Sequence, residues 1–80
     1  MSVNDAVALR FGELLAQNKM SQYKIMKKTG LSTSRLSCIM RSKNKTVTLS
    51  TVMLLSQGFG MTVAEFLTSP IFEFAKLEVE

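Results

Sequence analysis

The chain has 80 residues and a formal net charge of +4, and apolar residues make up 46% of it. This length suits one domain, and the apolar content is ample for a core, which excludes general disorder. There is no His and only one Cys, Cys38, so the usual zinc sites and an intrachain disulfide are excluded. Because Met1–Met20 has no long apolar block and no later segment is long enough, we expect neither a signal peptide nor a membrane span. The expected location is cytoplasmic and nucleoid-associated.

The basic residues are concentrated in one part of the chain. Between Arg10 and Lys45 there are nine Lys and Arg against the single Glu13, a net charge of +8, whereas the chain from Thr46 onward carries −3. A small domain with this asymmetry suits a polyanion on its basic side. The alternative is a solvated basic surface that has no partner.

Apolar periodicity and capping residues predict five helices. In chain order, the first follows Ser2 or Asn4 and ends near Asn18-Lys19, and the second runs from Gln22 to Lys28 or Thr29, where Gly30 stops it. The third covers about residues 32–41. The fourth follows Thr48, is weakened by Gly58 and ended by Gly60, and a short fifth helix opens at Thr62 and runs through Leu67. Each is preceded by a polar side chain that can accept N–H groups of the first turn. The candidate N-caps are Ser2 or Asn4, Ser21, Ser32 or Thr33, Thr48 and Thr62.

Apolar side chains are assigned to the core by their spacing. On the fourth helix one broad apolar face is predicted, made by Leu49, Val52, Leu55 and Phe59. Five methionines are expected to pack in the core rather than to form an adaptable binding surface: Met20, Met26, Met40, Met53 and Met61. Tyr23 is equally compatible with partial burial and with a contact to a phosphate.

The third helix has two chemically different sides. Leu36, Ile39 and Met40 form a compact apolar stripe, and the opposite side has no carboxylate. That opposite side consists of Ser34, Ser37, Cys38 and Arg41. It could approach base edges in the major groove, which is about 12 Å wide. Candidate phosphate contacts around it are Gln22 at the start of the second helix, together with Arg41, Lys43, Asn44 and Lys45.

Taken together, residues Leu9 to Leu67 resemble the Cro/C1-type (XRE) helix-turn-helix family of bacterial and phage regulators. The matching stretches are Leu9-Arg10 with Leu14-Leu15, Met20-Ser21-Gln22, Gly30-Leu31-Ser32, Leu36 with Ile39, Thr48-Leu49 with Thr51-Val52, Phe59-Gly60-Met61 and Glu65-Phe66-Leu67. The similarity covers about three quarters of the chain, and its strength lies in the order and spacing of the stretches.

The resemblance implies an all-α, compact five-helix, lambda-repressor-like domain over residues 1–69, with a short C-terminal tail over 70–80. It also implies a third helix that reads the major groove, and a dimer on a near-palindromic operator. Carried over by position, the base-reading residues are Thr33, Ser34 and Cys38, and Ser37 shares their helix face. Backbone contacts fall to Gln22, Ser32 and the loop 41–45.

Two positions depart from the family pattern. Met26 stands where the family usually has a small residue, between the two motif helices. Arg10 lacks the usual glutamate near the end of the third helix, since Met40 would face it. We therefore expect Arg10 to be available to DNA or to Glu13.

The sequence thus predicts a transcriptional regulator, in particular a repressor, that binds double-stranded DNA as a homodimer. The alternative is an antitoxin or immunity-type module that binds a protein partner through its apolar tail, made of Phe72, Phe74, Leu77 and Val79. That tail either packs on the domain or forms a dimer interface, and we favour dimerisation. An enzyme is not expected, because the sequence has no His, no Ser or Cys nucleophile paired with a general base, no glycine-rich phosphate-binding loop and no credible pair of catalytic carboxylates. No metal or cofactor is expected either. Cys38 as a redox switch is a further alternative.

Overall fold

The computed structural model describes residues 2–41, 47–73 and 77, and over these residues the chain is all-α. Its elements are α1 (Val3–Asn18), α2 (Gln22–Thr29), α3 (Thr33–Met40), α4 (Leu49–Gly58), α5 (Val63–Leu67) and the 3₁₀ helix η1 (Pro70–Phe72). The five predicted helices are confirmed. Each N-cap is a side chain named from the sequence, and each accepts a backbone N–H of the first turn: Ser2, Ser21, Ser32, Thr48 and Thr62.

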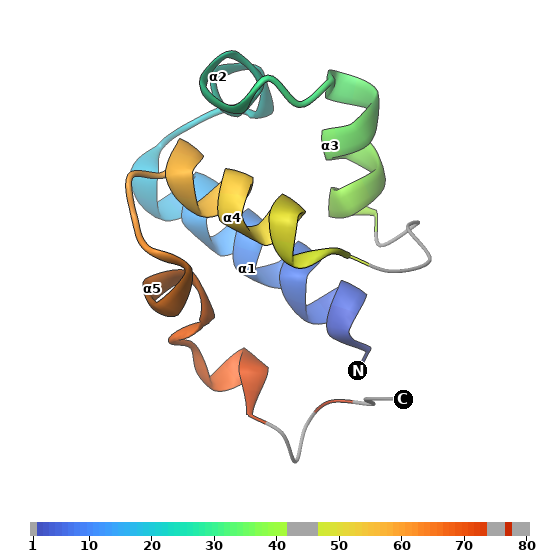
Figure 1. Cartoon of the computed structure of the whole chain (residues 1–80), viewed down its shortest axis with the longest axis vertical. Helices are drawn as coiled ribbons and strands as arrows, with labels where there is room; N and C mark the ends of the chain where they lie inside the picture. The colour runs from blue at the N-terminus through green and yellow to red at the C-terminus, as the bar shows by residue number, and fades with distance from the viewer. Residues whose placement is uncertain (1, 42–46, 74–76, 78–80) are drawn as a thin grey trace.

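Helices α1 and α4 form the centre of the fold, and the others are arranged around them. In Figure 1, α4 lies in front of α1, with α2 and α3 at one end of the molecule and α5 and η1 toward the other. Helix α1 contacts α3 and η1, α4 contacts α2 and α5, and α2 contacts α3. The pair α2–α3 is therefore held from two sides, which leaves the outer side of α3 to solvent.

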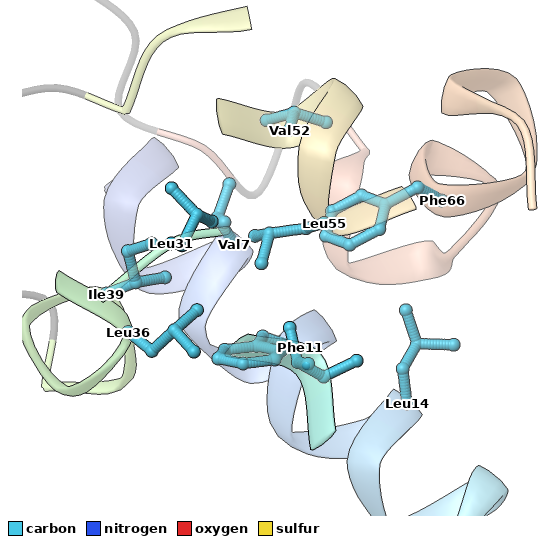
Figure 2. Packing of buried hydrophobic residues seen from close by; sticks show 10 residues of the cluster. Val7, Phe11, Leu14, Leu31, Leu36, Ile39, Val52, Leu55 and Phe66 are labelled. Atoms are coloured by element: carbon cyan, nitrogen blue, oxygen red, sulfur yellow. The ribbon is translucent and has the colours of Figure 1, made fainter. Parts of the chain in front are cut away.

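All five α-helices contribute to one core cluster. Its buried members are Val7, Phe11, Leu14, Ile25, Leu31, Leu36, Ile39, Val52, Leu55 and Phe66, most of them labelled in Figure 2. The Phe11 ring also meets the Phe59 ring edge to face, with centroids 6.0 Å apart, the geometry that aromatic pairs prefer. Met20, Met26, Met40 and Met61 pack against this cluster as expected.

The prediction for two α4 side chains is wrong. Leu49 is 65% exposed and Met53 is 53% exposed. Helix α4 has no charged residue to mark its outer side, so the apolar pattern does not determine which way the helix faces. The side that is buried instead includes Thr51 and Ser56. The Ser56 hydroxyl donates to the Val52 carbonyl at 2.8 Å, which satisfies it inside the core.

Part of the C-terminal tail packs on the domain. Phe72 in η1 lies against the core, and its ring centroid is 6.2 Å from that of Phe66. Leu77 is partly buried, whereas Phe74 and Val79 lie outside the described residues. Deletion of residues 71–80 is the direct test of the alternative in which the tail binds a protein partner. Because the deletion also removes the packed Phe72 ring, a loss of partner binding could equally result from damage to the core.

Helices α2 and α4 approach closely at Gly58. A Cβ atom at Gly58 would lie 2.8 Å from Thr29 Cγ2 and 3.4 Å from Ile25 Cδ1. Real Cβ atoms do not tolerate the first of these distances, so one helix would have to move. At Gly12 in α1 the nearest atom to an added Cβ is Met40 Cε at 3.8 Å, an ordinary contact.

We expect Gly58→Ala to lower the free energy of unfolding by about 1–3 kcal/mol, because overpacking displaces α2. Gly12→Ala is the matched control and should be neutral or stabilising by up to ~1 kcal/mol, since it only adds helix propensity. Urea unfolding followed by circular dichroism measures both. Equal effects of the two substitutions would contradict the close α2–α4 contact.

The Arg10 side chain points into the protein. It is 9% exposed, and its guanidinium donates from Nε to the Phe66 carbonyl at 2.7 Å and from Nη2 to the Glu65 carbonyl at 3.0 Å. Its Nη1 also lies 3.5 Å from Glu13 Oε1. The expected pairing with Glu13 is confirmed, and the expectation of a DNA contact is wrong. Arg10 instead satisfies carbonyls in the last turn of α5.

Arg10→Met keeps an unbranched apolar stem and removes the donors of the guanidinium. We expect it to destabilise the fold by about 2 kcal/mol, because two carbonyls lose a charged donor. Glu13→Gln should change stability by less than about 0.5 kcal/mol, since it weakens only an ion pair with an exposed partner. Thermal denaturation of both variants distinguishes these outcomes. If Arg10→Met left the stability unchanged, the hydrogen bonds from Arg10 to the α5 carbonyls would not contribute to it.

Candidate nucleic-acid interface

Helices α2 and α3 form a rigid helix-turn-helix unit. Gly30 ends α2 with φ +80°, the left-handed region that glycine adopts at little cost. The Thr29 hydroxyl donates to the Ile25 carbonyl at 2.7 Å and accepts the Leu31 N–H at 3.2 Å. Leu31 is buried directly after the turn. These contacts fix the direction in which α3 leaves α2.

The outer side of α3 carries the side chains predicted to read bases. Leu36 and Ile39 are buried on its inner side. Thr33, Ser34 and Cys38 are exposed, and Ser37 is partly buried. The chain has no carboxylate between Glu13 and Glu65. The structure therefore brings the four predicted residues together on one helix that can approach an anion without repulsion from its own acidic groups.

Three of the six predicted phosphate contacts, Gln22, Ser32 and Arg41, lie in the part of the chain that the structure describes. Gln22 is the first residue of α2, where backbone N–H groups have no acceptor within the helix. Ser32 caps α3, and its Oγ accepts the Arg35 N–H at 3.1 Å. Arg41 is exposed at the C-terminal cap of α3. The remaining three, Lys43, Asn44 and Lys45, lie outside the described residues.

Arg35 belongs to the same surface, although the sequence analysis did not select it. It is an exposed residue of α3, and its Nη2 donates to Thr51 Oγ1 at 3.3 Å. Thr51 is buried, and its Oγ1 also lies 3.1 Å from Oγ1 of Thr48, the N-cap of α4. Arg35 thus places a cation beside the reading face and ties α3 to the start of α4. On a helical wheel of α3, Arg35 lies next to Cys38, and this position could have identified Arg35 from the sequence.

Tyr23 does not enter the core. The residue is 56% exposed, and Lys27 Nζ lies 4.8 Å from the ring centroid, within the range of a cation–π contact. Tyr23 is the second residue of α2, next to Gln22. This leaves the ring on the surface near the candidate phosphate contacts.

A family model described as a Cro/C1-type HTH DNA-binding domain matches residues 10–70. The chain belongs to this family. Most of the chain is covered, from the middle of α1 to the start of η1, and the whole helix-turn-helix unit is included. The chain is therefore a DNA-binding, helix-turn-helix protein of the kind that regulates transcription. Neither the curated proteins nor the solved structures contain a significant match to it.

The described part of the chain contains neither a membrane-spanning helix nor a metal-binding cluster. None of the helices there is both long and apolar enough to cross a membrane. Among the same residues, His, Cys, Asp and Glu do not gather in any group of three or more that could hold a metal ion.

Cys38 provides a native probe of the candidate interface. Because the thiol is exposed on α3, we expect it to react readily with a thiol-specific reagent in the folded protein. Duplex DNA should slow this reaction about tenfold or more by covering the helix. The control is Thr68→Cys, at the C-terminal cap of α5, in a Cys38→Ser background, whose thiol should react equally fast with and without DNA. A Cys38 rate unaffected by saturating duplex would contradict the placement of α3 in a groove.

Proposed function

We propose that the chain is a sequence-specific repressor that binds operator DNA as a homodimer and inserts α3 into the major groove. The observation that carries the proposal is the outer face of α3, which is exposed, free of carboxylates and shared with the cations Arg35, on the same helix, and Arg41, at its C-terminal cap. Occupation of a promoter by such a complex prevents transcription from it.

The proposed base-reading residues are Thr33, Ser34, Ser37 and Cys38. Hydroxyl groups can donate to or accept from base edges, and the Thr33 methyl can contact a thymine methyl. Because these side chains are short, α3 must lie deep in the groove to use them. Each contact contributes modest discrimination, so part of the specificity comes from the shape and deformability of the DNA.

The proposed phosphate contacts are made by the surrounding groups. They comprise Gln22, Ser32 and Arg41, with Lys43, Asn44 and Lys45 following in the chain. Three of these groups are cationic, Arg41, Lys43 and Lys45, so a dimer can neutralise six phosphates, and the logarithm of its binding constant should fall with the logarithm of salt at a slope near about −5. In a dimer, two copies of α3 about 34 Å apart enter successive major grooves on one side of the duplex.

The two sets of residues are expected to behave differently on mutation. Gln22→Ala and Arg41→Ala should weaken binding to every duplex by similar factors, and Arg41→Ala should reduce the salt slope by about 1 for each protomer. Ser34→Ala should instead change the preferred bases, with a loss of about 1 kcal/mol of discrimination at the affected position, the contribution of one ordinary hydrogen bond. Selection from random DNA at two salt concentrations, followed by fluorescence anisotropy on selected and scrambled duplexes, measures both effects.

The matched control for the loss of a hydroxyl is Thr68→Ala, because Thr68 is exposed after α5 and belongs to no proposed contact. It should leave affinity and sequence preference unchanged. If Ser34→Ala and Arg41→Ala both weakened all duplexes equally, the assignment of α3 to base reading would fail. If no duplex bound even at low salt, the proposed function itself would fail.

A further inference from the structure

Arg35 is held by a neutral group that leaves its charge intact. Its Nη2 donates to Thr51 Oγ1 at 3.3 Å, although Arg35 itself is an exposed residue. Arg35 forms no ion pair with any other residue that the structure describes. A hydroxyl fixes the direction of a guanidinium without neutralising it. The full positive charge of Arg35 therefore remains available to an anion.

Thr51 is in turn fixed by the start of its own helix. The residue is 5% exposed, its N–H donates to Thr48 Oγ1 at 3.2 Å, and the two hydroxyl oxygens lie 3.1 Å apart. A guanidinium has donors only, so Thr51 Oγ1 accepts from Arg35 and can donate its own hydrogen to Thr48. The acceptor that holds Arg35 is thus a fixed point of the core and not a mobile surface group.

The place of Arg35 on α3 suits a phosphate better than a base. Around the helix axis it lies between Cys38, which is exposed, and Ile39, which is buried. Arg35 is therefore at the edge of the reading face and not at its centre. When a helix lies in the major groove, its edges face the sugar–phosphate walls, whereas its centre faces the bases.

We propose that Thr51 is a positioning residue, which holds Arg35 in the direction from which its guanidinium contacts a backbone phosphate. This inference rests on the proposed DNA-binding function, and it concerns a residue that does not touch DNA. Ordering a long, rotamer-rich side chain on binding costs affinity. Because Thr51 already restricts Arg35 in the free protein, less freedom is lost on binding. A guanidinium has five N–H donors, and the bond to Thr51 uses one of them, so others can reach a phosphate.

The salt dependence of binding separates the charge of Arg35 from its orientation. The slope near about −5 counts Arg41, Lys43 and Lys45 in two protomers, and one further phosphate for each protomer steepens it to about −7. Replacing Thr51 by an uncharged residue removes no cation. It should therefore change the affinity and leave the slope as it is.

The test measures duplex affinity by fluorescence anisotropy at several salt concentrations. Arg35→Met should weaken binding to all duplexes and return the slope to about −5. Thr51→Val keeps the shape of the side chain and removes the hydroxyl. It should weaken binding about twofold to tenfold for each protomer at an unchanged slope, because Arg35 must then be ordered on binding. Thr51→Ser retains the hydroxyl and should bind like the wild type.

Two comparisons distinguish positioning from a purely structural role. In an Arg35→Met background, Thr51→Val should cause no further loss of affinity, whereas damage to the fold would weaken both backgrounds alike. Ser56→Ala is the matched control, because Ser56 is also buried on α4 and its hydroxyl donates within the helix, to the Val52 carbonyl. It should leave affinity and slope unchanged. Circular dichroism confirms that the variants are folded, and Thr51→Ala is the second variant should Thr51→Val fail to fold.

The inference would be overturned if Thr51→Val bound DNA like the wild type, or if it lost the same factor with and without Arg35. An affinity that Arg35→Met leaves unchanged would overturn it as well. All of these outcomes are measured against a wild-type chain that binds DNA. They therefore differ from a failure of the proposed function, in which the wild type itself would bind no duplex and both proposals would fall.

Discussion

The burial of one side of α3 is the constraint on which the rest of the structure depends. Leu36 and Ile39 are enclosed by the core, which also holds Phe11 of α1 and Leu31 of the turn. Because a helix presents opposite sides to core and solvent, this burial determines that Ser34 and Cys38 face outward. A recognition helix needs such a rigid support, since short side chains can reach base edges only if the backbone is held close to the groove.

Much of the fold could be predicted because its signals are local. Every helix starts at a side chain that caps its own first turn, so the N-caps and the turn at Gly30 follow from short stretches of sequence. The outer face of α3 was predictable for a related reason, because apolar and polar residues alternate there with helical period. Lys43, Asn44 and Lys45 remain predictions.

The features that could not be predicted depend on contacts between residues distant in the sequence. Arg10 finds its carbonyl acceptors in α5, and no pattern around Arg10 indicates that partner. The close contact of α2 and α4 depends on Gly58 facing Thr29, whereas the sequence indicated only that this glycine weakens the helix before Gly60 ends it. Leu49 and Met53 were misplaced because α4 is apolar or neutral on all sides, so that only the packing of its neighbours decides which side is buried.

Helix α4 supports the candidate DNA surface from the inner side of α3. Its first turn holds the Arg35 guanidinium, which donates to Thr51 Oγ1, and the same oxygen lies beside the hydroxyl of Thr48, the N-cap of α4. Thr51 is buried, so it cannot contact DNA itself. Its substitution would nevertheless reach the candidate DNA surface, because it removes the group that holds Arg35. The position of a cation beside the reading face thus depends on a helix that no proposed base or phosphate contact belongs to.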